Sequence, residues 1–152
     1  MAWTLLLAAG QGNRLASATG GLAKQFLDWK GAPLYWESTL VFSRCARVEG
    51  LVFVFPEACI DEERERVAGL MRNASLGIPW KVVAGGALRQ DSVRNGLSAL
   101  PDDCMEVLIH DAARPFVSPV LVNRILDGLH GEASGECVAA CIPGIPVVDT
   151  IK

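Results

Sequence analysis

The sequence lacks the cysteine patterns that hold structural metal ions or disulfide frameworks. Its five cysteines are scattered and odd in number, and none forms a C-x-x-C pair. A disulfide scaffold or a zinc site is therefore not expected, and free thiols suit a reducing compartment. Cys137 and Cys141 stand four residues apart, but no histidine accompanies them, so we interpret both as packing residues.

Neither an excess of basic residues nor a long apolar run is present. The net charge is −3, whereas a general nucleic-acid-binding protein normally carries a basic face. The apolar stretch from Leu5 to Ala9 is too short to cross a bilayer or to form the core of a signal peptide. We expect a soluble, cytoplasmic protein that binds neither nucleic acid nor membranes.

The chain has 152 residues, of which 51% are hydrophobic and 20% charged, enough to build one core. Apolar runs of strand length lie at residues 3–7, 51–55, 81–83, 107–109 and 138–142, and Val147 and Val148 resemble the start of another. Segments with helical spacing lie at residues 33–45, 61–71, 92–100 and 122–129, the first with Pro33 in its first turn. This alternation predicts an α/β fold of three layers with a mostly parallel central sheet.

The loop after the first predicted strand contains small residues from Ala8 to Gly12 and then Arg14, and Lys24 follows. Small residues let the backbone approach an anion, and the two cations add positive charge, which together favour a phosphate site. The loop is neither a Walker A motif nor a dinucleotide fingerprint, because no Gly-Lys-Ser/Thr ends it and Leu15 replaces the third glycine. A plain strand-to-helix connection with solvated cations is the alternative.

Two further strands are followed by unusual segments, and ligands of open α/β sheets bind beyond the carboxyl ends of the strands. Gly85 and Gly86 precede Ser92, whose hydroxyl could read the edge of a base together with exposed backbone groups. Alternatively, Asp91 or Ser92 caps the following helix. Arg89 could touch a ligand, or it could pair with Asp91 or Glu106 instead.

The third segment places Asp111 and Arg114 after an apolar strand with only alanines between them. Asp111 could hold a divalent cation or a sugar hydroxyl, and Arg114 could grip a phosphate with its guanidinium group. A structural ion pair between the two residues is the alternative. We interpret His110 as a hydrogen-bonded, partly buried histidine rather than a catalytic base, because a phosphate nucleophile is already ionised at neutral pH.

Taken together, five motifs in register give the chain a family resemblance. They are Ala8-Ala9-Gly10-x-Gly12-x-Arg14, Lys24-Gln25-Phe26-Leu27, Gly85-Gly86-Ala87-x-Arg89-Gln90-Asp91-Ser92-Val93-x-Asn95-Gly96-Leu97, His110-Asp111-Ala112-Ala113-Arg114-Pro115-Phe116 and Asp149-Thr150-Ile151-Lys152. This set strongly resembles the 2-C-methyl-D-erythritol 4-phosphate cytidylyltransferase family of the nonmevalonate isoprenoid pathway. The resemblance implies a Rossmann-like nucleotidyltransferase fold and transfer of a cytidylyl group from CTP to methylerythritol phosphate, with release of pyrophosphate.

The resemblance also implies roles for individual residues. Arg14 and Lys24 would stabilise the transition state, and Mg²⁺ would be bound mainly through the CTP triphosphate, with Asp111 as a candidate protein ligand. The implied nucleotide-binding residues are Ala8, Ala9, Gly10, Gly12, Arg14, Lys24, Gly86, Ala87, Arg89 and Ser92. The implied residues for methylerythritol phosphate are Asp111, Arg114 and Thr150.

The chain departs from the family pattern in three places. Ala23 replaces a proline before the lysine, Leu88 replaces a residue that is more often polar, and extra residues separate Arg14 from Lys24. The family also carries a later arm that pairs with a second subunit, so we expect residues 1–152 to be a catalytic domain without its C-terminal part, and a homodimer when full length. The alternatives are a cytidylyltransferase for another polyol phosphate, such as ribitol 5-phosphate, and a CTP-binding module inactive through truncation.

Overall fold

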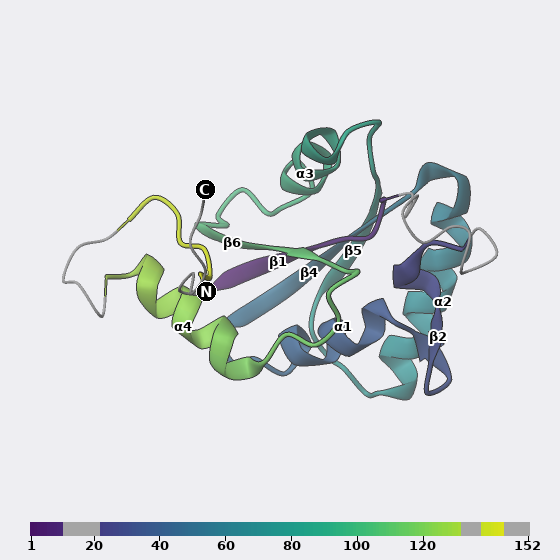
Figure 1. Ribbon diagram of the computed structural model, residues 1–152, viewed down its shortest axis with the longest axis horizontal. Coiled ribbons are helices and arrows are strands. Elements are labelled where there is room, and N and C mark those ends of the chain that lie inside the picture. Colours follow the sequence, from purple (N-terminus) through teal and green to yellow (C-terminus); the bar gives the residue numbers. More distant parts are fainter. Residues whose placement is uncertain (11–21, 132–137, 145–152) are drawn as a thin grey trace, which may run out of the picture. The chain divides into compact units, whose positions relative to one another are not determined.

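Four apolar segments form a parallel sheet at the centre of the larger part of the molecule (Figure 1). The computed structural model describes residues 1–10, 22–131 and 138–144. These belong to two units, Met1–Phe116 and Val117–Lys152. The sheet lies in the first unit and has the order β5-β4-β1-β6. Its strands are β1 (Ala2–Leu7), β4 (Val48–Phe55), β5 (Trp80–Ala84) and β6 (Glu106–Asp111).

The two central strands explain why the sequence shows continuous apolar runs rather than alternation. Residues 51–55 of β4 are all fully buried, as are Leu5 and Leu6 of β1. Strands of a parallel sheet are covered on both faces, so both sets of side chains must be apolar. The first four predicted strands are confirmed, each with one to three additional residues at its ends.

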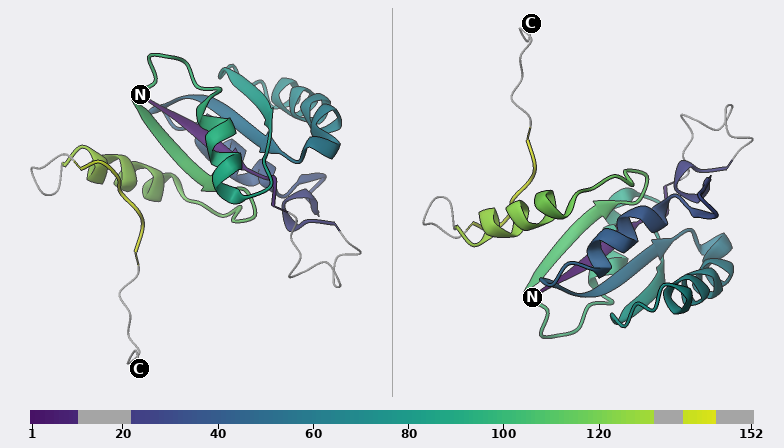
Figure 2. Two further views of the ribbon diagram at one scale, coloured as in Figure 1. Left: turned by 90° about the horizontal axis from the view of Figure 1, so that it is seen from above. Right: turned by 90° about the horizontal axis from the view of Figure 1, so that it is seen from below.

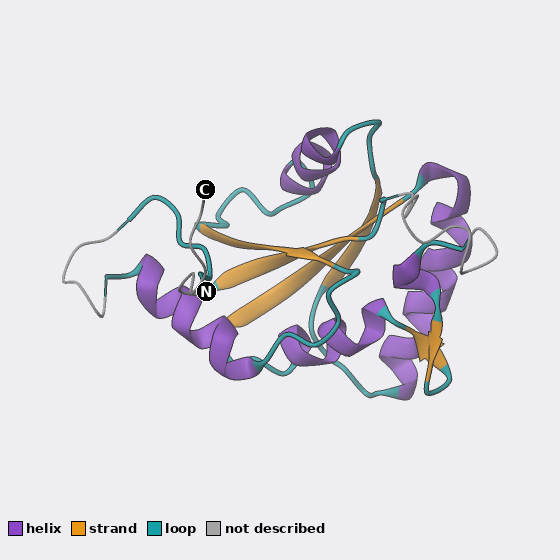
Figure 3. Ribbon diagram, in the orientation of Figure 1, coloured by secondary structure: helices purple, strands orange, loops and turns teal. Residues whose placement is uncertain are grey.

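Helices cover both faces of this sheet and give three layers (Figures 1 and 3). Helix α3 (Arg89–Leu97) packs on β1, β4 and β5, and α1 (Tyr35–Ser43) lies on the opposite face (Figure 2). Helix α2 (Ile60–Asn73) packs on β5 on the same side as α1, as right-handed crossovers from β1 to β4 to β5 require. The predicted three-layer α/β fold with a parallel sheet is confirmed.

The connection from β1 to α1 contains elements that the sequence pattern did not predict. A short 3₁₀ turn, η1 (Lys24–Phe26), precedes a hairpin of β2 (Asp28–Trp29) and β3 (Ala32–Pro33). Both residues between these strands have positive φ, 56° and 82°, as in a type I′ turn. The predicted place of Pro33 in the first helical turn is wrong, because Pro33 ends β3 and the helix begins at Tyr35.

A buried polar group lies among the aromatic rings between α1 and α2. The Tyr35 hydroxyl donates a 2.8 Å hydrogen bond to Glu63, and the Glu63 carboxylate also lies 3.0 Å from Arg66. Burial raises the pKa of the Glu63 carboxyl, although Tyr35 and Arg66 oppose that shift. Burial and the neighbouring Glu63 raise the pKa of Tyr35 as well. The pair is therefore held as a neutral phenol that donates to a poorly solvated carboxyl group.

The second unit contains α4 (Pro119–Leu129), which confirms the predicted helix at residues 122–129. The Ser118 hydroxyl accepts a hydrogen bond from the Leu121 amide at 3.1 Å, and proline occupies the first helical position. The predicted strand at residues 138–142 is wrong. The Val138 amide donates instead to Leu129 at the end of α4, and the described part of this unit offers no strand for it to pair with. Val147 and Val148 lie outside the described residues.

Candidate functional site

The order of the strands brings the ends of β1 and β6 together. The chain proceeds from β1 to β4 and β5 on one side, and then returns to place β6 on the other side of β1. Leu7 pairs with Asp111, and the Ala112 amide donates to the Leu7 carbonyl at 3.0 Å. A reversal of strand order of this kind opens a crevice at the carboxyl ends of the strands, where open α/β folds bind ligands. The first and third predicted segments begin where these two strands end.

The first loop is fixed to the sheet at its start. The Ala8 amide donates to the Val54 carbonyl at 2.8 Å, and the Gln25 side chain donates to the carbonyls of Ala8 and Gly10 at 2.7 Å each. Ala8 is buried, whereas a Cβ atom placed on Gly10 would meet no other described residue within 4 Å. The predicted residues Gly12 and Arg14 lie outside the described part of the chain.

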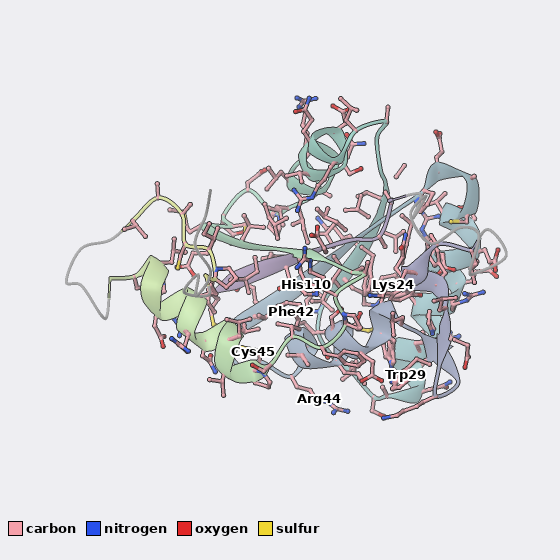
Figure 4. All side chains as sticks on the ribbon, in the orientation of Figure 1. Lys24, Trp29, Phe42, Arg44, Cys45 and His110 are labelled. Atoms are coloured by element: carbon pink, nitrogen blue, oxygen red, sulfur yellow. The ribbon has the colours of Figure 1, made fainter. Side chains whose placement is uncertain are left out.

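Lys24 begins the 3₁₀ turn that follows this loop, and its side chain lies on the side of the sheet where the strands end (Figure 4). The residue is half-buried. No carboxylate among the described residues lies within ion-pair distance of its ammonium group. A half-buried cation with no counter-ion in this part of the structure can neutralise a bound anion, as the phosphate hypothesis requires.

The second segment packs directly against the first. A Cβ atom placed on Gly85 would lie 2.3 Å from the Cβ atom of Ala9 and 2.9 Å from the Ser92 hydroxyl, so only glycine fits. The Gly85 amide donates to the Phe55 carbonyl at 2.7 Å. Glycine at positions 85 and 86 therefore lets the backbone lie close to Ala9 and Asp91, where a larger residue would clash. The predicted base-reading and phosphate-binding loops are in contact.

Two side chains of α3 accept hydrogen bonds from backbone amides of this loop. Helix α3 begins at Arg89, three residues earlier than predicted, and Leu88 is its N-terminal cap. Asp91 accepts a hydrogen bond from the Leu88 amide at 3.1 Å, which supports the capping interpretation for that residue. The Ser92 hydroxyl instead accepts from the Gly86 amide at 3.1 Å, so Ser92 organises the glycine turn and does not cap the helix. A contact of Ser92 with a base stays a prediction.

Asp111 joins the second and third segments. Its carboxylate lies 2.9 Å from Nη2 of Arg89 and 3.6 Å from Nε of Arg114. The alternative of an ion pair between Asp111 and Arg114 is thus observed, although the Arg114 side chain remains largely exposed. Asp91, one of the partners suggested for Arg89, pairs with Arg94 at 3.2 Å instead. The sequence did not suggest the pairing of Arg89 with Asp111.

His110 supports the turn that carries Asp111 and Arg114. Its Nε2 atom lies 2.9 Å from the Arg114 carbonyl, and because a carbonyl only accepts, this nitrogen carries the proton. The ring packs edge-on against Phe42 at 5.1 Å between centroids (Figure 4). Burial lowers the pKa of His110, which keeps the ring neutral near pH 7. The expected hydrogen-bonded, partly buried histidine is confirmed.

Two contributors to the site were missed by sequence reasoning. Gln25 holds the first loop, and Asn95 donates to the Ala84 carbonyl at 3.0 Å where β5 ends. Both residues occur within the quoted motifs, which was the only signal available. The predicted residues now placed at this edge are Ala8, Ala9, Gly10, Lys24, Gly86, Ala87, Arg89, Ser92, Asp111 and Arg114; Thr150 lies outside the described residues.

Residues 1–10, 22–131 and 138–144 contain neither a metal-binding cluster nor a membrane-spanning helix. These residues contain no group of three or more histidine, cysteine, aspartate or glutamate side chains placed to hold a metal ion. No helix within them is both long and apolar enough to cross a membrane. The metal role of Asp111 stays a prediction.

Comparison with known proteins gives the family. The sequence model of the 2-C-methyl-D-erythritol 4-phosphate cytidylyltransferases, IspD, matches residues 2–152. The chain belongs to this family. Its resemblance to the family, first apparent in five separate motifs, therefore extends over almost the whole sequence.

Curated relatives of the family are longer than this chain. The chain is 54% identical over 150 residues to the bifunctional enzyme IspD/IspF of Nitratidesulfovibrio vulgaris, covering 99% of this chain and 37% of that protein. It is 36% identical over 152 residues to the 2-C-methyl-D-erythritol 4-phosphate cytidylyltransferase of Solibacter usitatus, covering 97% and 58%. The chain thus spans about a third of the length of the bifunctional relatives.

Solved structures confirm the nucleotidyltransferase fold. The 4-diphosphocytidyl-2C-methyl-D-erythritol synthase of Anaerococcus prevotii superimposes with a TM-score of 0.68 at 21% identity, covering 86% of this chain and 51% of that one. The inositol-1-phosphate CTP transferase of T. maritima gives 0.55 at 21% identity, covering 72% and 42%. At such identities the likeness concerns the fold alone.

Proposed function

We propose that the protein transfers a cytidylyl group from CTP to 2-C-methyl-D-erythritol 4-phosphate and releases pyrophosphate. Membership of the family supports this activity. The observation that carries it is the meeting of three segments at one edge of the sheet. The first loop contacts the glycine turn at Ala9 and Gly85, and Asp111 ties that turn to the third segment through Arg89.

The reaction asks the protein mainly to position two anions and to neutralise charge. An oxygen of the acceptor phosphate attacks the α-phosphorus in line, the bond from phosphorus to the bridging oxygen breaks, and pyrophosphate carries away the electron pair. Lys24, a half-buried cation without a described counter-ion, would stabilise the negative charge that builds on the triphosphate, together with Arg14. No general base is required, which agrees with the neutral, hydrogen-bonded His110.

Each half of the site has its own proposed ligand. The glycine turn with Gly86, Ala87 and Ser92 would recognise cytosine, because backbone groups of such a turn can read the edge of a base. Asp111 and Arg114, with Thr150, would bind the methylerythritol phosphate. The position of Arg89 between the two halves lets it contact the nucleotide while it holds Asp111.

A divalent cation, Mg²⁺ in our proposal, would be bound mainly by the CTP triphosphate. The donor chemistry fits such an arrangement, because Asp111 supplies a carboxylate oxygen, the ligand type that Mg²⁺ prefers, while the described residues offer no complete protein cage. A solved structure with the same fold, Rv0371c of Mycobacterium tuberculosis, is titled a complex with manganese. When bound, the cation would offset negative charge on the phosphates.

The assembly and compartment also form part of the proposal. We expect the full-length protein to form a homodimer, as the family resemblance implies, and to work in the cytoplasm, where CTP is available. Gel filtration with light scattering tests the dimer. A monomer that retains turnover would contradict it.

The activity is tested by pyrophosphate release from CTP and methylerythritol phosphate in the full-length protein. Lys24→Ala and Arg14→Ala should each lower kcat by about 10²- to 10³-fold, since each removes a charged donor to the transition state. Lys30→Ala, at an exposed cation of the β2–β3 hairpin, serves as the matched control and should leave the rate unchanged. Near-normal turnover of Lys24→Ala would contradict the assigned role.

Substrate panels separate the remaining alternatives. A preference for ribitol 5-phosphate over methylerythritol phosphate in kcat/KM would identify a cytidylyltransferase for another polyol phosphate. Calorimetric CTP binding without product after long incubation would identify an inactive binding module.

A further inference from the structure

Gln25 is one of few polar side chains buried in the first unit, with only 3% of its surface exposed. A single atom, Nε2, lies 2.7 Å from the carbonyl oxygens of both Ala8 and Gly10. Two acceptors at this distance require the amide nitrogen, with its two hydrogens, to occupy that position. Both amide hydrogens of the Gln25 side chain are therefore donated to carbonyls of the first loop, 17 and 15 residues earlier in the chain.

These bonds determine which way the loop's peptide groups face. In a trans peptide the carbonyl and the following amide hydrogen point in opposite directions, and the described chain contains no cis bond. With the Ala8 carbonyl directed at Gln25, the Ala9 amide hydrogen points away from it. That amide donates to no acceptor among residues 1–10, 22–131 and 138–144. Its orientation suits an anion bound over the loop.

Gln25 is itself held firmly. It lies in η1, where the Phe26 amide donates to the Ala23 carbonyl at 2.9 Å, and the Phe26 ring packs against Tyr35 and Phe55 in the core. Lys24 is the neighbouring residue of the same turn. The glutamine thus ties the loop backbone to the turn that carries Lys24.

We propose that Gln25 is a positioning residue for the triphosphate of CTP. It turns the peptide group between Ala8 and Ala9 so that its N–H faces the phosphates, and it anchors this part of the loop to the turn that carries Lys24. The inference rests on the proposed function, because it assigns the phosphate half of the site to CTP. It acts through the backbone, without a contact between Gln25 and the nucleotide.

The test replaces Gln25 with methionine, which has a similar length and no hydrogen-bond donor. A loop that no longer presents its N–H should bind CTP about 10- to 100-fold more weakly, the range of a hydrogen bond to a charged group. We expect the KM for CTP to rise and kcat to fall in Gln25→Met, while the KM for methylerythritol phosphate stays within twofold of the unaltered protein.

The control is Tyr35→Phe, which removes a buried hydrogen bond to Glu63 away from the loop. Tyr35→Phe should lower the thermal midpoint, as we also expect of Gln25→Met. It should leave the KM values for CTP and methylerythritol phosphate unchanged. A merely structural role for Gln25 would reduce the folded, active fraction and so lower apparent kcat at constant KM for CTP. That outcome, or unchanged kinetics in Gln25→Met, would overturn the proposal.

Binding measurements separate this inference from the proposed function. If the unaltered protein binds CTP in calorimetry but makes no product, the proposed activity fails, whereas weaker CTP binding by Gln25→Met than by Tyr35→Phe still supports the positioning role. Equal CTP affinity of the two variants would overturn the positioning role even in an active enzyme.

Discussion

Arg89 and Asp111 are joined by an ion pair of 2.9 Å although 22 residues separate them in the sequence. Arg89 is the first residue of α3 and Asp111 is the last residue of β6, so the pair links the start of the helix between β5 and β6 to the carboxyl end of β6. The Arg89 side chain is 65% exposed and that of Asp111 is 39% exposed. Such exposed pairs contribute little to stability, and we propose that this one positions Asp111 at the site.

A double-mutant cycle tests this coupling. Arg89→Met and Asp111→Asn should each lower kcat/KM, and the double variant should lose less than the sum of the two free-energy effects, because each single change already breaks the pair. The free energy of unfolding should change by less than about 1 kcal/mol in all three. Strictly additive losses in kcat/KM would show that the two residues act independently.

Gly85→Ala should disturb the first two loops together. The added methyl group would lie 2.3 Å from the Ala9 Cβ atom, which cannot move without its backbone. We expect a loss of about 1–3 kcal/mol in the free energy of unfolding, as for other overpacked sites, together with a higher KM for CTP. Urea denaturation and steady-state kinetics measure both effects.

Gly77→Ala is the matched control for that substitution. Nothing lies within 4 Å of a Cβ atom placed on Gly77, and its φ is not positive. The change should leave the KM for CTP unaltered and leave stability equal or raise it by about 0.4–1 kcal/mol. Equal behaviour of the two alanine variants would contradict the close packing of Gly85.

Glu63→Gln should change how stability depends on pH. Burial raises the folded-state pKa of this carboxyl, which faces Tyr35, Arg66, Glu62 and Cys59. The folded state therefore keeps the proton where the unfolded chain has released it. Stability from this group is present below the unfolded pKa of about 4.3 and is lost as pH rises through the folded pKa.

The amide of the glutamine variant does not titrate, so it avoids that loss. The difference in unfolding free energy between Glu63→Gln and the unaltered protein should move in favour of the variant above about pH 4.3 and then level off. Urea denaturation between pH 4 and pH 8 measures it. A difference that moves in favour of the unaltered protein as pH rises would mean that the Arg66 ion pair outweighs burial.

Thr4→Val should stabilise the sheet. Thr4 lies in the middle of β1, is completely buried, and its hydroxyl has no hydrogen-bond partner among the described residues. Valine has the same shape without the unsatisfied polar group, so we expect the free energy of unfolding to rise by about 1 kcal/mol. Thr4→Ser, which keeps the hydroxyl and loses the methyl group, should be destabilised instead. Destabilisation by both substitutions would indicate that the hydroxyl is satisfied.

The sheet was predictable because its strands are buried on both faces. Residues 51–55 are apolar without interruption, and only a strand between two helical layers demands this. The run at residues 138–142 is also apolar throughout but forms no strand, because an apolar run does not by itself supply a neighbouring strand to pair with. The β2–β3 hairpin was not predicted because strands of two residues are too short to show an alternation of apolar and polar residues.

The candidate site was predictable in outline but not in its contacts. A parallel sheet collects the carboxyl ends of its strands at one edge, so residues after β1, β5 and β6 had to lie near one another. Sequence spacing does not predict which side chains donate to backbone carbonyls of another loop or strand. Gln25 and Asn95 form bonds of this kind. The pairing of Arg89 with Asp111 also depends on the sheet order, which places β1 and β4 between β6 and β5.

The central place of β1 has a consequence for synthesis on the ribosome. This strand is made before its partners, which are residues 48–54 on one side and residues 106–111 on the other. Native contacts over such long sequence separations form slowly, because the intervening chain must be ordered first. Strand β1 therefore keeps one edge open until β6 has been synthesised. Folding intermediates that expose this apolar edge should be the species most prone to aggregate during expression.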